Sequence, residues 1–261
     1  MRKMKNNVMF ASAFTAAALL FSCQDKKFTE VVEVPLPTAQ EKVSIGYPED
    51  VKAKEGSFQV EKLPYAYDAL SPTVSPLTLE THYSKHYLSD TNGLNAAIAG
   101  TPYQNQSIVD ILSKLDIRDT GLRNDAGGYY NHSLYWKSMA PDTGGTPTDT
   151  IAGTINRDFG SFANFKSAFK AEASSQVGSA WTFLVVDKYG KLRITSTQNQ
   201  DNPLMRNAAV PGTPILALDL WEHAYYLGYQ YRRKNYIDSF FNVINWKQIN
   251  ENYEEALRKK Y

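Results

Sequence analysis

The chain has 261 residues, of which 43% are hydrophobic and 21% are charged, and its formal net charge is +1. This composition is typical of a globular protein with one large domain or two small ones. A net charge so close to zero argues against nucleic acid as a partner, because phosphate binding needs a clustered excess of Lys and Arg.

Residues 1–22 have the pattern of a secretory signal. Three basic residues precede an apolar run over residues 8–21, which is too short for a bilayer span of about 20 residues. The sequence LFSC that follows resembles a bacterial lipobox, in which the cysteine becomes the lipidated first residue. We therefore predict a bacterial lipoprotein signal peptide at 1–22 and lipidation of Cys23, with an ordinary signal peptide as the alternative.

Cys23 is the only cysteine, so no disulfide can form within the chain. Cleavage before it would remove three positive charges and leave a formal net charge of −2. Residues 24–56 are rich in Lys, Glu and Pro and show no sustained hydrophobic period. We predict that residues 23–56 form a flexible tether, which as a coil would span roughly 30 Å. The expected location is the periplasmic or cell-surface side of a membrane.

Residues 57–141 are predicted to form an N-terminal helical domain. One helix is expected over residues 75–100, with Ser75 as a cap followed by proline. A second helix is expected from about residue 105 to 115. A third covers residues 127–141, with a pair of glycines near its start and a proline at its end.

Residues 142–261 mix helical and strand periods and are predicted to form a second, α/β domain. A Gly/Pro/Thr loop over residues 141–153 joins the two halves. A hairpin is expected over residues 181–198 and a third buried strand over residues 214–220. Helices are expected over residues 159–176, with Phe159, Phe162, Phe165 and Phe169 in the core, and over residues 242–261. The fold class is therefore α+β.

Imidazole and carboxylate side chains gather in two motifs. THYSKHYLSD, residues 81–90, puts His82, His86 and Asp90 at steps of four, along one face of a helix. DLWEHAYY, residues 219–226, puts His223 four residues after Asp219, where both can converge on one ion. Such a pair also occurs as a helix cap beside an ordinary histidine.

The chain has four histidines, and all of them lie in apolar segments rich in aromatic residues: His82, His86, His132 and His223. Most histidines of globular domains lie at the surface, so this concentration indicates a shared role.

The motifs HYSKHY, NHSLYW, GSAWTFLVV, STQNQDNP and DLWEHAYYL, in this order, resemble the iron/manganese superoxide dismutase family over residues 58–261. The resemblance implies a helical hairpin followed by a three-stranded antiparallel sheet with helices. It places the ligands of one metal ion per subunit on His82, His132, Asp219 and His223. The implied reaction converts superoxide to dioxygen and hydrogen peroxide through a redox cycle of the metal.

The resemblance also assigns residues around the ion. Gln200 matches the glutamine that manganese-type members set against the solvent on the metal, with glycine at the position of Gly128. This combination favours manganese, with iron as the other possibility. Three tryptophans match the aromatic wall that keeps the family's site dry, a role that core packing alone would also explain: Trp136, Trp181 and Trp221.

Two further matches imply contact between subunits. Glu222 matches a residue that bonds the ligand histidine of the neighbouring subunit. His86 matches one that bonds a tyrosine of the neighbouring subunit, here Tyr226. We therefore expect a homodimer or a dimer of dimers.

Asp90 is a departure, because the family has a tyrosine at its position. An ionised Asp90 would repel superoxide and slow the enzyme, whereas a protonated one would deliver protons. The third possibility is metal binding without effective dismutation. The sequence thus favours a superoxide dismutase tethered to the cell envelope, because a scaffold has no need of Gln200. The alternative is a catalytically impaired metal-binding envelope protein on the same fold.

Overall fold

A computed structural model of the chain describes residues 45–258. The predicted signal peptide, Cys23 and the tether up to residue 44 lie outside the described residues. Within the described part of the chain, no helix is long and apolar enough to cross a membrane.

A continuous helical rod forms the first half of the fold. It consists of α1 (Pro76–Thr81), a π-helical segment η2 (His82–Tyr87) and α2 (Leu88–Ile98). Ser75 caps its start, with its hydroxyl accepting a hydrogen bond from Thr78 N. The predicted helix is present here, but its middle, the HYSKHY motif, is wound as a π-helix, the type of irregularity that is frequent at functional sites.

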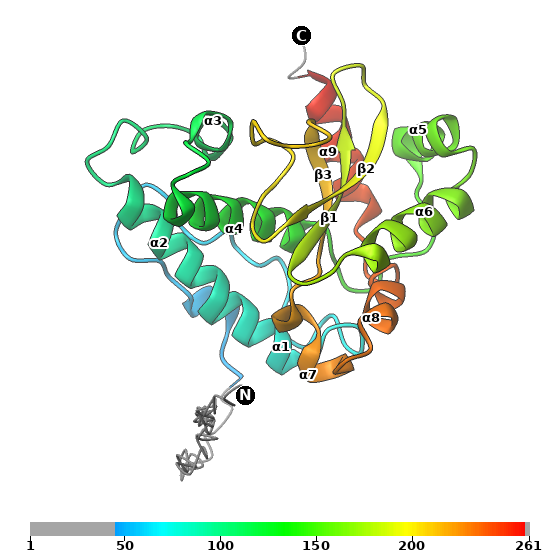
Figure 1. Ribbon diagram of the computed structural model, residues 1–261. Helices are drawn as coiled ribbons and strands as arrows, with labels where there is room; N and C mark the ends of the chain where they lie inside the picture. The colour runs from blue at the N-terminus through cyan, green and yellow to red at the C-terminus, as the bar shows by residue number, and fades with distance from the viewer. Residues whose placement is uncertain (1–44, 259–261) are drawn as a thin grey trace, which may run out of the picture. The chain divides into compact units, whose positions relative to one another are not determined.

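The rod packs against the long helix α4 (Thr120–Lys137), and α3 (Ile108–Lys114) lies between them in the chain (Figure 1). The prediction that the third helix begins near residue 127 is wrong. Asp119 caps the helix eight positions earlier, where its carboxylate accepts a hydrogen bond from Leu122 N. The pair Gly127 and Gly128 therefore lies inside a helix, where the absence of side chains allows close contacts rather than a turn.

The second half contains an antiparallel sheet of three strands in the order β2-β1-β3. The strands are β1 (Ala180–Val186), β2 (Leu192–Gln198) and β3 (Thr213–Asp219). Every residue of the central strand β1 is buried, as its continuous apolar run predicts. The register sets Trp181 of β1 directly opposite Asp219 of β3, so the end of β3 lies beside an indole ring.

Helices cover the sheet, with α4 beside β3 and α6 beside β2 (Figure 1). The helices of this half are α5 (Asp149–Phe159), α6 (Phe162–Ser175), α7 (Tyr226–Tyr229), α8 (Arg233–Phe240) and α9 (Trp246–Arg258), of which α5, α6 and α9 contact the sheet. The predicted α+β class, a helical hairpin followed by a three-stranded sheet with helices, is confirmed. The loop predicted over residues 141–153 is too long, because α5 begins at residue 149. Of the four phenylalanines, Phe165 and Phe169 are fully buried, whereas Phe159 and Phe162 are partly buried against the core.

Residues 45–56, assigned above to the tether, are packed on the helical rod. They include a short turn, η1 (Pro48–Asp50). Gly46 N donates to Glu80 Oε1 at 2.9 Å, and Lys54 N donates to Asn92 Oδ1 at 2.7 Å. The tether prediction therefore extends too far, because polar side chains of the rod bind the backbone of this segment.

Candidate metal centre

The structure brings together His82, His132, Asp219 and His223. His82 begins η2, His132 lies in the second half of α4, and Asp219 ends β3. The carboxylate Oδ1 of Asp219 accepts a hydrogen bond from Trp221 N at 2.8 Å, which turns the chain out of the strand. The short 3-10 helix η3 (Glu222–Ala224) follows and carries His223 back toward Asp219.

Three imidazole nitrogens surround one carboxylate oxygen. From Asp219 Oδ2, the Nε2 atoms of the histidines lie 3.2 Å away in His82, 3.6 Å in His132 and 3.0 Å in His223. Asp219 and His132 are completely buried, and His82 nearly so. Four donors of these types around one point suit a transition metal ion.

Two observations fit a metal ion at this position. The Nε2 atoms of His82 and His132 are buried and lack a hydrogen bond within residues 45–258. A buried polar atom without a partner is costly, and an ion would satisfy both. The Nδ1 atom of His132 lies 2.7 Å from the carbonyl oxygen of Gly128 and donates to it, which leaves Nε2 as the ring nitrogen that can bind a cation.

The electrostatics of the cluster also suit a cation. Burial, together with the nearby His223, lowers the pKa of His82 well below its ordinary value, so its ring is neutral. Burial would raise the pKa of Asp219, but the surrounding histidines outweigh it and hold that pKa well below its usual range. Burial likewise opposes a charge on His132, but Asp219 and Asp90 raise its pKa to about 9. A metal ion bound at His132 Nε2 would have to displace any proton held there.

The predicted aromatic wall surrounds the histidines. The ring centroid of Trp136 lies 4.7 Å from that of His82, and the ring of Trp181 meets His132 edge-on at 5.1 Å. Both indoles are fully buried. Trp221 is half-buried and stacks on His223 at 5.5 Å. Bulky apolar rings on several sides limit the access of water to the cluster.

Hydrogen bonds fix the side chain of Gln200 so that its amide N–H is the group it can offer to another molecule. Its side-chain oxygen accepts a hydrogen bond from Trp181 Nε1 at 2.9 Å, so what it can offer another group is its amide N–H. Its backbone oxygen accepts one from Asn131 Nδ2 at 3.0 Å. A Cβ on Gly127 would lie 2.0 Å from that oxygen. Gly127 and Asn131 thus fix the Gln200 loop on α4, a role that sequence reasoning missed although the paired glycines were its signal.

His86 and Asp90 lie beside the cluster. The rings of His86 and His223 have centroids 4.2 Å apart, and burial lowers the pKa of His86 to about 4. Asp90 Oδ2 lies 3.7 Å from His86 Nε2 and 3.3 Å from His132 Nδ1. The latter contact joins residues of two helices and was not predicted. Tyr87, three residues before Asp90, is fully buried, and its hydroxyl accepts a hydrogen bond from Glu61 N.

The two residues expected at a subunit contact lie at the surface. Glu222 is exposed, and Tyr226 is 51% exposed, next to Leu227 at 60%. They adjoin His223, whose side chain is 27% exposed and thus the most open of the four clustered residues.

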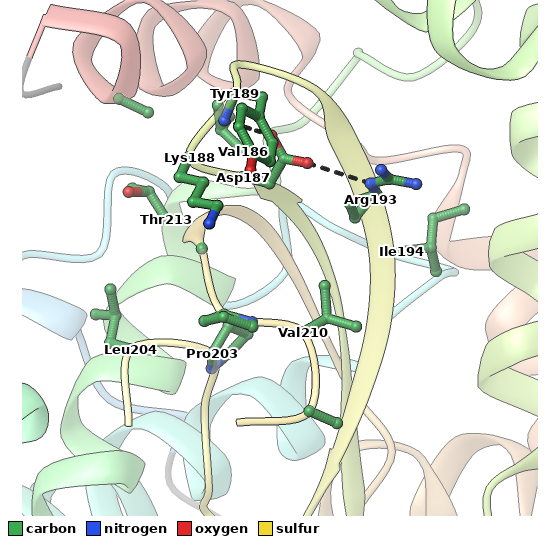
Figure 2. A pocket seen from close by; sticks show the side chains of 14 residues that line it. Val186, Asp187, Lys188, Tyr189, Arg193, Ile194, Pro203, Leu204, Val210 and Thr213 are labelled. Atoms are coloured by element: carbon green, nitrogen blue, oxygen red, sulfur yellow. Dashed lines mark hydrogen bonds and ion pairs between the residues drawn. The ribbon is translucent and has the colours of Figure 1, made fainter. Parts of the chain in front are cut away.

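A separate hollow of about 890 Å³ lies at the far end of the hairpin, lined by residues that include Val186, Lys188 and Val210 (Figure 2). In it, Asp187 pairs with Arg193 at 3.3 Å. None of the four clustered residues lines this hollow. The hollow is therefore separate from the cluster of histidines.

The fold and the cluster define a class of protein that holds one transition metal ion between a helical hairpin and a small antiparallel sheet. Comparisons with known proteins identify the class more closely. Residues 57–140 match the model of the iron/manganese superoxide dismutase α-hairpin domain, and residues 147–252 match that of the C-terminal domain.

Curated relatives cover most of the described chain. A protein named superoxide dismutase [Mn] from Pseudomonas aeruginosa is 46% identical over 199 residues, which are 75% of this chain and 96% of that protein. One of the same name from Acinetobacter baylyi is 43% identical over 204 residues, 77% of this chain and 90% of that protein. A superoxide dismutase [Mn/Fe] from Methylomonas sp. is 44% identical over 205 residues, 77% of this chain and all of that protein. The chain belongs to the iron/manganese superoxide dismutase family.

Proposed function

We propose that the protein is a manganese superoxide dismutase, with His82, His132, Asp219 and His223 as the metal ligands. The observation that carries the proposal is the convergence of three histidine Nε2 atoms on Asp219 Oδ2 at 3.0 to 3.6 Å. When bound, manganese or iron supplies a one-electron couple by which one superoxide is oxidised to dioxygen and a second, with two protons, is reduced to hydrogen peroxide.

The side chains of this chain have separate tasks in that reaction. The carboxylate of Asp219 balances the charge of the ion, and its Oδ1 is kept in place by Trp221 N. Gln200 provides an amide donor whose orientation is fixed by the indole N–H of Trp181. The rings of Trp136 and Trp181 exclude water, which strengthens these electrostatic interactions.

Manganese is favoured because position 128 cannot supply the glutamine donor instead. A Cβ on Gly128 would lie 2.3 Å from Asp90 Oδ2, so no larger side chain fits there while Asp90 keeps its place. The donor therefore comes from Gln200. The relatives named for manganese, and the one named for both metals, agree with this preference.

The test is superoxide dismutation per bound ion by the protein loaded separately with manganese and with iron. We expect turnover well above that of the free ion and higher with manganese. His82→Ala should lose both metal and activity, whereas Gly153→Ala, at an exposed position with open space around it, should keep both. Full metal occupancy with turnover no better than the free ion would refute the dismutase and favour the impaired metal-binding protein.

We also propose that two subunits meet over Glu222 and Tyr226, with His86 beside them. Support comes from the exposed apolar surface of Tyr226 and Leu227 next to the partly open His223. Sedimentation should show a dimer or a larger assembly, which Glu222→Ala weakens. Tyr231→Ser is the matched control, because Tyr231 is 82% exposed on a neighbouring turn. A monomeric native protein would contradict this proposal.

We further propose that the protein is exported and held on the outer side of a bacterial membrane by lipid on Cys23. The support is the apolar run and the LFSC motif at the start of the chain. In expressing cells, the wild type should partition with membranes, and Cys23→Ser should release it to the soluble envelope fraction. Equal partitioning of the two would argue for an ordinary signal peptide.

A further inference from the structure

Asp90 faces a ligand histidine rather than the solvent. Its side chain is 13% exposed, and its Oδ2 is buried and accepts no hydrogen bond from residues 45–258. The imidazole nitrogen nearest to this oxygen is Nδ1 of His132, at 3.3 Å. His86 Nε2 lies further away, at 3.7 Å.

Gly128 makes this contact possible. It lies one helical turn before His132 in α4, and its missing side chain leaves the space that the Asp90 carboxylate enters from α2. A Cβ there would lie 2.3 Å from Oδ2 and 2.7 Å from Cγ of Asp90. The same N–H of His132 also donates to the carbonyl oxygen of Gly128 at 2.7 Å. The ring is thus positioned by the backbone, and the Asp90 carboxylate lies next to the same nitrogen without a hydrogen bond of its own.

We propose that Asp90 acts through His132, as a carboxylate on the outer nitrogen of a metal ligand that stabilises the oxidised form of the bound metal. The proposal rests on the proposed function, because it requires an ion at His132 Nε2. A carboxylate next to the Nδ1–H group polarises that bond and makes the imidazole a stronger donor at Nε2. A stronger donor favours the higher oxidation state, so Asp90 lowers the reduction potential of the centre.

The test is the midpoint potential of the manganese-loaded protein, measured by redox titration of its visible absorption. Asp90→Asn keeps the size of the side chain but removes its charge, while the Gly128 carbonyl still positions the ring. We expect a higher potential, with the oxidised-to-reduced ratio at fixed poise falling about tenfold, which is about 59 mV for a one-electron couple. Unchanged potential in a fully loaded Asp90→Asn protein would overturn the inference.

A second variant separates contact from charge. Gly128→Ala keeps the carboxylate but forces it away from His132, so it should shift the potential in the same direction. Combined with Asp90→Asn, it should add little. Additive shifts, or no shift in Gly128→Ala, would mean that Asp90 acts only as a distant charge and would refute the role through His132.

Asp110→Asn is the matched control. It makes the same change from carboxylate to amide on α3, where Asp110 pairs with Lys114 at 2.9 Å and forms no ion pair with a histidine among residues 45–258. The potential should not move in this variant. In the zinc-loaded, diamagnetic protein, the Nδ1 proton resonance of His132 should move upfield in Asp90→Asn and stay in Asp110→Asn. If the wild type binds no ion at the cluster, the proposed function itself fails, and that outcome is distinct from an unchanged potential.

Discussion

Replacing Gly127 by alanine should destabilise the protein by about 3 kcal/mol, although alanine is the better helix former. Gly127 lies inside α4, where its Cα faces the backbone of the Gln200 loop. An added Cβ would lie 2.0 Å from the Gln200 carbonyl oxygen and 2.9 Å from its carbon. Because these are backbone atoms, the loop as a whole must move.

Two costs and one gain make up the expected change in the free energy of unfolding. Overpacking a tight contact costs about 1 to 3 kcal/mol. Loss of the buried hydrogen bond from Asn131 Nδ2 to Gln200 O costs about 1 to 3 kcal/mol more. The helix gains about 1 kcal/mol from alanine. The net loss is about 3 kcal/mol, and the displaced Gln200 should also reduce activity.

The assay is denaturant unfolding of the metal-free protein, so that metal affinity does not enter the result. Gly153→Ala is the control, because Gly153 lies inside α5 with nothing near its Cβ position and should show only the gain of roughly 0.5 to 1 kcal/mol. If Gly127→Ala is as stable as Gly153→Ala, the close approach of α4 and the Gln200 loop is not a constraint and the reasoning is refuted.

Three further predictions concern charge, the indole donor and the metal. Burial and the nearby Asp90 raise the pKa of Asp125 from 3.8 to about 6, so its ionised form destabilises the folded state above pH 6 and this penalty disappears as the pH falls toward 4. Asp125→Asn should therefore stabilise the protein at pH 7.5 by about 1 kcal/mol after solvent screening, and not at all at pH 3.5; an equal effect at both values would contradict it. Trp181→Phe removes the donor to Gln200 Oε1 and should cost about 2 to 4 kcal/mol in unfolding experiments, with activity per bound ion reduced about 10-fold to 100-fold. Removing the metal with a chelator should lower the free energy of unfolding by about 4 kcal/mol relative to protein with free ion at a thousand times Kd. His223→Ala should strongly reduce this difference between the metal-loaded and metal-free protein. Calorimetry that finds no difference in the wild type would argue against the cluster as the binding site.

Much of the site can be predicted from the sequence because its residues stand in short, dense motifs. In DLWEHAYY, the distance from Asp219 to His223 is set locally by the end of β3 and the turn into η3. The buried strand β1 and the hairpin also follow from local patterns, since an apolar run flanked by turn residues has few alternatives.

The contacts that hold these motifs together join residues far apart in the sequence, and local sequence patterns do not predict them. Asp90 reaches His132 only because Gly128, on another helix, has no side chain. The glycine pair was interpreted as a helix start, since glycine is a poor helix former, and only the tertiary contact explains its place inside α4. The π-helical turn at His82–Tyr87 likewise has no signal in hydrophobic periodicity.

The division of the ligands between the two halves of the chain has a consequence for maturation. His82 and His132 come from the helical hairpin, whereas Asp219 and His223 follow the last strand. A nascent or unfolded chain therefore holds no more than part of the ligand set close together, such as the pair of Asp219 and His223, and an incomplete set binds ions weakly. The complete set exists only after β3 has paired with β1 and docked beside α4. We therefore expect the complete ligand set to become available only late in folding, so that the ion acquired should follow the supply in the compartment where folding finishes.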